Sequence, residues 1–131
     1  MGKKVILVVF GTRPEAIKMA PVIKELKESF KVFICVTGQH REMLDQVLEV
    51  FNIRPDYDLN LMKRDQDLFD LTKNILLKVK KVIEKISPNL ILVHGDTTTA
   101  MVTSIAAFYL KIPLGHVEAG LRTKNLYSPF P

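Results

Sequence analysis

Short apolar runs alternate with amphipathic patterns along the chain. Four runs have the length and composition of strands, and they cover residues 5–10, 31–37, 90–94 and 113–117, with a weaker candidate at 59–62. The first three are rich in Val, Ile and Leu, which is typical of strands buried on both faces of a sheet. The pattern therefore predicts a sheet at the centre of the domain.

Between these runs, apolar residues recur at the spacing of amphipathic helices. One series is Ala16, Met19, Ala20, Ile23 and Leu26, and a second is Leu68, Leu71, Ile75, Val79, Val82 and Ile86. Segment 99–110 is apolar nearly all round, so we expect its helix to be buried. Strands that alternate with helices predict a parallel sheet with right-handed crossovers. Residues 1–131 are thus expected to form one α/β, Rossmann-like domain.

Composition agrees with a globular domain. The 131 residues are 47% hydrophobic and 25% charged, enough for a single core. No apolar segment reaches the length of a membrane helix. Lysines precede the first apolar run, but Gly-Thr-Arg-Pro-Glu follows it without a small-residue cleavage site. We interpret the run as a strand rather than a signal peptide, and we expect a cytoplasmic protein with no membrane partner.

The charge and the rare side chains exclude some functions. Much of the net charge of +5 comes from lysines spread over 73–85, which indicate a solvated helix face rather than a nucleic-acid site. The single cysteine, Cys35, lies in an apolar run and is predicted to be a buried thiol. The three histidines lack metal-ligand spacing, so no metal site is expected.

Polar, glycine-containing segments follow each main strand, at 11–15, 37–41, 94–99 and 118–122. In open parallel sheets, ligands bind outside the carboxyl ends of the strands. We therefore expect these four loops to share one edge of the sheet and to form a single cleft.

The first loop has the features of an anion site. Thr12 and Glu15 have the spacing of a capping box, so a helix should begin there. Its free backbone amides and the positive end of its dipole favour an anion. Arg13 adds a donor fork suited to phosphate, and Lys18 is within reach on the next turn. The alternative is a capped helix with a surface arginine. The loop is neither a Walker A motif nor a GxGxxG fingerprint, which disfavours an NTPase or a nicotinamide enzyme.

Asp96 and Glu118 each follow an apolar strand closely, so both carboxylates should face the cleft. Two carboxylates in one site can supply an acid and a base. Asp96 could instead cap the helix at 97–110, and Glu118 could pair with Arg122 or Arg41. On the same edge, His94 is a candidate ligand contact, whereas His116 is assigned a structural role.

Five blocks carry a family resemblance. They are GTRPEAIKMAP (11–21), TGQHREMLDQVL (37–48), VHGDTTTA (93–100), GHVEAGLRT (115–123) and YSPFP (127–131). They resemble the non-hydrolysing UDP-N-acetylglucosamine 2-epimerases, in order and across the whole chain. The resemblance implies a two-lobe, glycosyltransferase-B-like fold, of which residues 1–131 are the N-terminal lobe and the UDP-binding lobe lies outside them.

The resemblance also implies an activity: reversible epimerisation of UDP-N-acetylglucosamine to UDP-N-acetylmannosamine, by elimination and re-addition of UDP, for cell-envelope polysaccharides. It implies no cofactor. By motif position, Arg13 and Lys18 would bind substrate, and Asp96 and Glu118 would act in proton transfer and sugar binding, with the identity of the base open. Gln39 matches part of a site for a second UDP-N-acetylglucosamine, an allosteric activator. A homodimer is implied for the full enzyme.

Other functions fit the same features. A glycosyltransferase of the same two-lobe architecture is one, and a non-catalytic nucleotide-sugar-binding module is another. Because the second lobe is expected to hold further catalytic groups and most of the UDP pocket, residues 1–131 alone are predicted to be inactive.

Overall fold

The sheet is fully parallel and has five strands. The computed structural model describes residues 2–38, 41–61 and 65–118. The strands are β1 (Val5–Phe10), β2 (Lys31–Val36), β3 (Tyr57–Asp58), β4 (Leu90–His94) and β5 (Leu114–Val117), in the spatial order β3-β2-β1-β4-β5. Each neighbouring pair is parallel. All the strands therefore end at the same edge, and the predicted Rossmann-like fold is confirmed.

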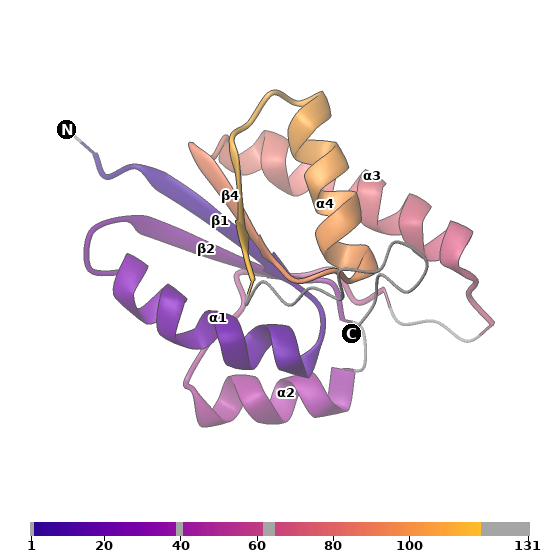
Figure 1. Ribbon diagram of the computed structural model, residues 1–131, viewed down its shortest axis with the longest axis horizontal. Coiled ribbons are helices and arrows are strands. Elements are labelled where there is room, and N and C mark those ends of the chain that lie inside the picture. The colour runs from indigo at the N-terminus through magenta and orange to yellow at the C-terminus, as the bar shows by residue number, and fades with distance from the viewer. Residues whose placement is uncertain (1, 39–40, 62–64, 119–131) are drawn as a thin grey trace, which may run out of the picture.

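Helices cover both faces of this sheet (Figure 1). Helices α1 (Arg13–Leu26) and α2 (Arg41–Val50) lie on one face, and α3 (Leu68–Ile86) and α4 (Thr98–Tyr109) lie on the other. Side chains of a strand alternate between faces, so the central strand β1 supplies both cores. Ile6, Val8 and Phe10 face α1 and α2. Leu7 and Val9 face α3 and α4.

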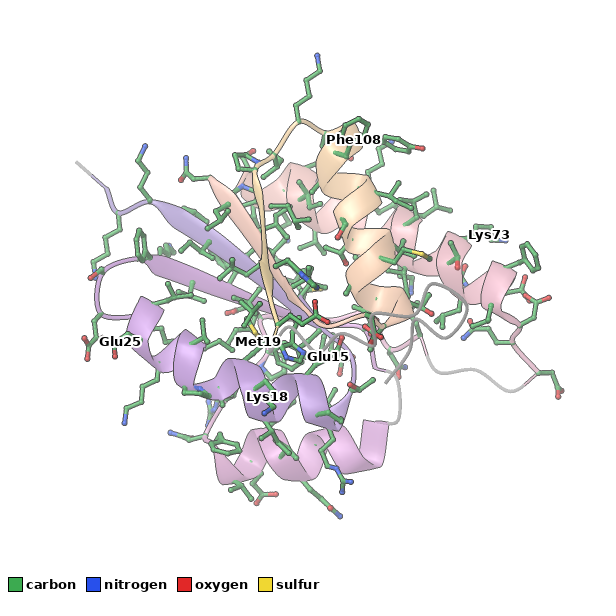
Figure 2. All side chains as sticks on the ribbon, viewed as in Figure 1. Glu15, Lys18, Met19, Glu25, Lys73 and Phe108 are labelled. Carbon is green, nitrogen blue, oxygen red and sulfur yellow. The ribbon has the colours of Figure 1, made fainter. Side chains whose placement is uncertain are left out.

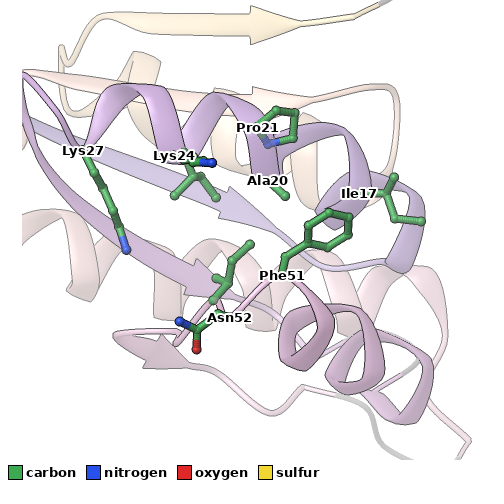
Figure 3. Close-up of a pocket in the computed structure, with 9 residues that line it drawn as sticks. Ile17, Ala20, Pro21, Lys24, Lys27, Phe51 and Asn52 are labelled. Carbon is green, nitrogen blue, oxygen red and sulfur yellow. The ribbon is translucent and has the colours of Figure 1, made fainter.

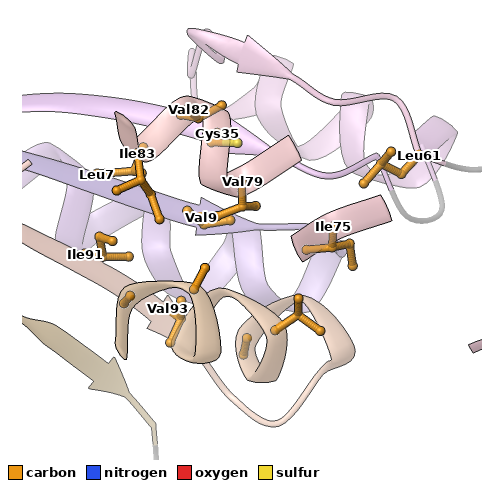
Figure 4. Close-up of a cluster of buried hydrophobic side chains, with 14 of the residues drawn as sticks. Leu7, Val9, Cys35, Leu61, Ile75, Val79, Val82, Ile83, Ile91 and Val93 are labelled. Atoms are coloured by element: carbon orange, nitrogen blue, oxygen red, sulfur yellow. The ribbon is translucent and has the colours of Figure 1, made fainter. Parts of the chain in front are cut away.

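The core beneath α3 and α4 is the larger cluster of buried apolar side chains (Figure 4). Ile75 and Val79 of α3 pack over Leu7 and Val9 of β1. All four side chains are fully buried. The apolar side of α3, which repeats every 3.6 residues, therefore packs on the apolar side of β1, which repeats every two residues.

The lysines of α3 confirm the expected solvated face. Lys73, Lys78, Lys80, Lys81 and Lys85 are all exposed, and Lys73 points away from the sheet in Figure 2. The same helix therefore buries its apolar series and exposes its charges.

Two sequence predictions about elements were incomplete. The weak strand candidate at 59–62 is misplaced by two residues, because the strand in this region, β3, consists of Tyr57 and Asp58. The amides of Leu59 and Leu61 still bond to the end of β2, at the carbonyls of Val36 and Thr37. Asn60, between them, has a φ of 49°, which ends the extended conformation. Met62 lies outside the described residues.

Helix α2 was not predicted, although buried Leu44, Val47 and Leu48 have helical spacing.

The expectation that the helix at 99–110 is buried was wrong. One face of α4, including Thr99, Val102 and Ala106, is buried against the sheet and α3. Met101 is 53% exposed and Phe108 78% exposed. Helix α4 packs on β1, β4 and β5, and no described element covers its outer face.

Cys35 is a core residue of β2, as predicted, with no exposed surface. Burial raises the pKa of its thiol to about 12, and the negative charge of Asp58 adds to the effect. The folded protein therefore holds this thiol neutral. Unfolding restores a thiol with a pKa near 9.0, so this group lowers stability as the pH rises from about 9 towards 12.

We expect native Cys35 to resist alkylation. At pH 8, iodoacetamide should modify it more than about 100-fold more slowly than the urea-unfolded chain, because the thiolate is the reactive form and the side chain is enclosed. Mass spectrometry of quenched samples measures both rates. Equal rates in native and unfolded protein would show that β2 opens readily.

Candidate functional site

The carboxyl ends of the strands gather several of the predicted residues. Gly11 follows β1, Thr37 follows β2, Gly95 follows β4 and Glu118 follows β5. Because the strands are parallel, these positions share one edge (Figure 1). The predicted convergence is therefore confirmed for the described loops. Gln39, the predicted activator contact, lies outside the described residues.

The carboxylate of Glu15 organises the first loop. Its Oε2 accepts hydrogen bonds from the amides of Gly11 at 2.7 Å and Thr12 at 2.8 Å, and from the Thr12 hydroxyl at 3.1 Å. The predicted start of the helix is thus confirmed, with Thr12 as its N-cap. The amides of Gly11 and Thr12 are therefore not free for an external anion, because they bind the protein's own carboxylate.

Arg13 and Lys18 remain the cations of this loop. Arg13 is the first residue of α1, and both side chains are exposed. Figure 2 shows Lys18 about one turn beyond Glu15 along the helix. With the Gly11 and Thr12 amides occupied, any binding of phosphate here would depend on these side chains more than on the backbone.

Two side-chain contacts join the loops to one another. The Thr97 hydroxyl donates to Oε1 of Glu15, across 82 residues of sequence. The hydroxyls of Thr37 and Thr99, both buried, lie 3.0 Å apart. The loops after β1, β2 and β4 are therefore held together by hydroxyl groups at the edge of the sheet.

Asp96 does not cap α4. The N-cap is Thr97, whose hydroxyl accepts from the amide of Ala100 at 3.2 Å. The alternative assignment of Asp96 as a capping residue was therefore wrong. Its exposed carboxylate lies at the edge of a cavity of about 380 Å³, which is lined by Gly95, Asp96, Ala100, Met101, Ser104 and His116.

His116 links this cavity to Glu118. Its Nε2–H can donate to the carbonyl oxygen of Gly95, and the two atoms lie 2.5 Å apart. Its Nδ1 lies 3.5 Å from Oε2 of Glu118. The Gly95 amide also donates to the Val117 carbonyl at 3.2 Å. The loops that carry Asp96 and Glu118 are thus adjacent.

His116 was assigned a structural role, and its contact with the Gly95 carbonyl, which joins β5 to the loop after β4, agrees with that assignment. Its proximity to Glu118 could have been predicted, because residues two apart on a strand point to the same face. His94 is half-buried, and its Nδ1 has no hydrogen-bond partner among the described residues. It does not line the cavity beside Asp96. The proposed partners of Glu118, Arg122 and Arg41, have no described side chains.

A larger groove, of about 480 Å³, lies between α1 and the end of α2 (Figure 3). Ile17, Ala20 and Phe51 line it, and Lys24 and Lys27 are also part of its lining. None of its lining residues is a carboxylate, and none lies in the loops after β4 or β5. The groove is therefore separate from the site with Asp96 and Glu118.

The described part of the chain was also searched for metal-binding clusters and for membrane-spanning helices. Within it, no three His, Cys, Asp or Glu side chains lie close enough together to hold a metal ion. No helix among the described residues is both long and apolar enough to cross a bilayer.

A parallel sheet of this order, with helices on both faces, defines a Rossmann-like lobe. The sequence model of the UDP-N-acetylglucosamine 2-epimerases matches residues 24–131. The chain belongs to this family.

Its similarity to known proteins is high but covers only part of each. A probable UDP-N-acetylglucosamine 2-epimerase of Ralstonia nicotianae is 64% identical over 98% of this chain and 35% of its own length. The enzyme of Campylobacter jejuni is 60% identical over 98% of this chain and 34% of its own length. The chain thus spans about a third of these relatives.

Solved structures give the same result. The crystal structure of the Neisseria meningitidis epimerase bound to UDP-GlcNAc superposes with a TM-score of 0.88 at 60% identity, covering 97% of this chain and 35% of the other. The Methanocaldococcus jannaschii epimerase, in complex with UDP-GlcNAc and UDP, gives 0.84 at 34% identity, covering 91% and 33%. The fold of the lobe is therefore the fold found in this family.

Proposed function

We propose that this chain is the N-terminal lobe of a non-hydrolysing epimerase that interconverts UDP-N-acetylglucosamine and UDP-N-acetylmannosamine. The observation that carries the proposal is the placement of Asp96 in a cavity that His116 also lines, with the Glu118 carboxylate 3.5 Å from the His116 ring. Family membership and relatives bound to UDP-GlcNAc support the same substrate. In this proposal a second lobe supplies most of the UDP pocket, and the complete enzyme is a cytoplasmic homodimer.

The reaction requires a proton to be removed and returned at one carbon. In the elimination step, the bond between the sugar's first carbon and the UDP oxygen breaks, UDP leaves as an anion, and a base takes the proton from the second carbon. Re-addition of UDP to the resulting double bond, with a proton delivered to the other face, gives the epimer. Two carboxylates can hold the proton on opposite faces of the sugar, as base and acid.

The leaving UDP carries the negative charge that develops in this step. Arg13 and Lys18 would stabilise that charge, because both are exposed cations at the start of α1. A guanidinium binds phosphate through two parallel N–H donors. The Glu15 carboxylate already occupies the nearby amides, so these side chains carry the electrostatic stabilisation from this lobe.

Gln39 remains our proposal for a contact to a second, activating UDP-N-acetylglucosamine.

The test of the function is exchange at the second carbon of the sugar. A complete protein carrying this chain, incubated with UDP-N-acetylglucosamine in deuterium oxide, should replace that proton with deuterium and form UDP-N-acetylmannosamine, as followed by NMR. Residues 1–131 alone should do neither. Transfer of the sugar to an acceptor without exchange would instead establish a glycosyltransferase. Binding without either reaction would establish a non-catalytic module.

We expect Arg13→Ala to weaken substrate binding roughly 10- to 100-fold in the complete protein, the scale of a lost hydrogen bond to a charged group. Arg13→Lys should lose less, because it keeps the charge and loses only the fork. Calorimetric titration with UDP-N-acetylglucosamine measures both. Lys24→Ala, an exposed charge on the same helix, is the matched control. Parental affinity in both Arg13 variants would exclude this residue from the phosphate site.

A further inference from the structure

Glu15 makes more contacts than helix capping requires. A capping glutamate needs only to accept from the amide of the N-cap residue, and it can do so from the surface. This side chain is only 2% exposed. A buried carboxylate is costly unless hydrogen bonds satisfy it. Here, four donors do so: two amides and two hydroxyls.

The two oxygens of this carboxylate serve different loops. Oε2 holds Gly11 and Thr12, the residues just before Arg13. Oε1 accepts from the hydroxyl of Thr97, the residue just after Asp96. One rigid, planar group therefore connects the loop after β1 to the loop after β4, near the carboxyl ends of the strands (Figure 2).

The Thr97 hydroxyl is fixed by this contact. It donates its proton to Glu15 and accepts from the amide of Ala100 at the start of α4. A hydroxyl has one proton, so both roles are defined at once. The first turns of α1 and α4 are thereby held in one arrangement, and the backbone at Asp96 is held with them.

We propose that Glu15, acting through Thr97, is a positioning residue that sets Asp96 relative to Arg13. The inference rests on the proposed epimerase function, in which these two side chains act on one substrate. Glu15 itself is buried and does not touch the substrate. Its effect is on geometry: a displacement of about 1 Å in a catalytic group can lower a rate by about 100-fold.

The decisive variant is Thr97→Val in the complete protein. It keeps the shape of the side chain and removes the hydroxyl, while Glu15 retains its bonds to Gly11 and Thr12. We expect kcat for epimerisation to fall about 10- to 100-fold, with a much smaller change in KM, because the reacting group is misplaced while the substrate contacts remain. Thr97→Ser, which restores a hydroxyl, should recover most of the lost kcat.

Loss of a helix cap needs its own control, because Thr97 also caps α4. Asp67 caps α3 in the same way, accepting from the amide of Asp70 at 2.7 Å, and α3 carries none of the proposed site. Asp67→Ala should lower the denaturation midpoint by the amount typical of a lost helix cap and leave kcat within about twofold. An equal loss of kcat in both variants, or parental kcat in Thr97→Val, would overturn the inference.

A second measurement does not depend on the activity. In ¹H–¹⁵N spectra of the complete protein, Thr97→Val should shift the amide signals of Gly11 and Thr12, more than 80 positions away in sequence, and Asp67→Ala should not. If the parental protein shows no epimerisation, the proposed function fails, and these signals still test the link between the loops. Unchanged signals would overturn the link whatever the activity.

Discussion

Asp96→Asn and Glu118→Gln, each introduced into a complete protein carrying this chain, should lower kcat for epimerisation by at least about 100-fold, the scale for loss of a general acid or base. Both changes keep the size of the side chain and remove its ability to hold a proton reversibly. Binding of UDP-N-acetylglucosamine should change much less. The measurement is the initial rate of epimer formation by NMR, together with deuterium incorporation at the second carbon.

The two variants can also separate the acid from the base. Each epimer presents its proton to a different face of the sugar. A variant that lacks one base should therefore lose exchange more severely from one epimer than from the other, and assays started from each nucleotide sugar compare the two. Glu84→Gln, an exposed carboxylate of α3, controls for the change in charge. Near-parental turnover in both site variants would leave these carboxylates without a catalytic role.

Ile75→Ala should lower the free energy of unfolding by about 2–5 kcal/mol, the range for truncation of a large aliphatic side chain in a core. Ile75 is fully buried between α3 and the sheet, in the cluster that contains Leu7 and Val9 (Figure 4). The surrounding strands belong to a paired sheet and cannot collapse into the space that is left. Urea denaturation followed by circular dichroism measures the change.

Leu77→Ala is the matched control, two residues further along the same helix. Leu77 is 51% exposed, so its truncation removes less buried surface and should cost less than about 1 kcal/mol. Helix propensity is nearly the same in the two variants, because both introduce alanine. Equal losses at the two positions would mean that α3 does not pack on the sheet as described.

Strands β1, β2, β4 and β5 and three of the helices could be predicted because their signal is local, whereas β3 has only two residues and gave no such signal. A buried parallel strand needs a continuous apolar run, and β1, β2 and β4 have one. Helix α2 was missed because its apolar series is short. The burial of α4 was overestimated because an apolar sequence shows only that a helix can be buried. Phe108 is exposed because no described element packs against it, and the sequence of α4 does not contain that information.

The site was predictable only in outline. Parallel strands bring their carboxyl ends together, so the neighbourhood of Asp96 and Glu118 followed from the fold class. The hydrogen-bond partner of each polar side chain could not be predicted, because a shift of a few tenths of an ångström between distant segments decides which bond forms. Capping propensity alone could not decide between Asp96 and Thr97, and the capping box at Glu15 gave no sign of its bond across 82 residues.

The strand order has a consequence for how this domain is made. Strand β1 lies at the centre of the sheet, between β2 and β4. Its neighbour β2 is synthesised soon after it. Its other neighbour, β4, follows α3, so that Ile6 pairs with Leu90, which is far along the chain. The chain is synthesised from the N-terminus, at about 5–20 residues per second. Until β4 emerges from the ribosome, β1 has an unpaired edge, and Leu7 and Val9 lack the cover of α4, which follows β4 in the chain. Such an edge is prone to pair with other chains. The nascent chain is therefore most vulnerable to aggregation between the synthesis of β2 and that of β4, and chaperone binding in that interval would protect it.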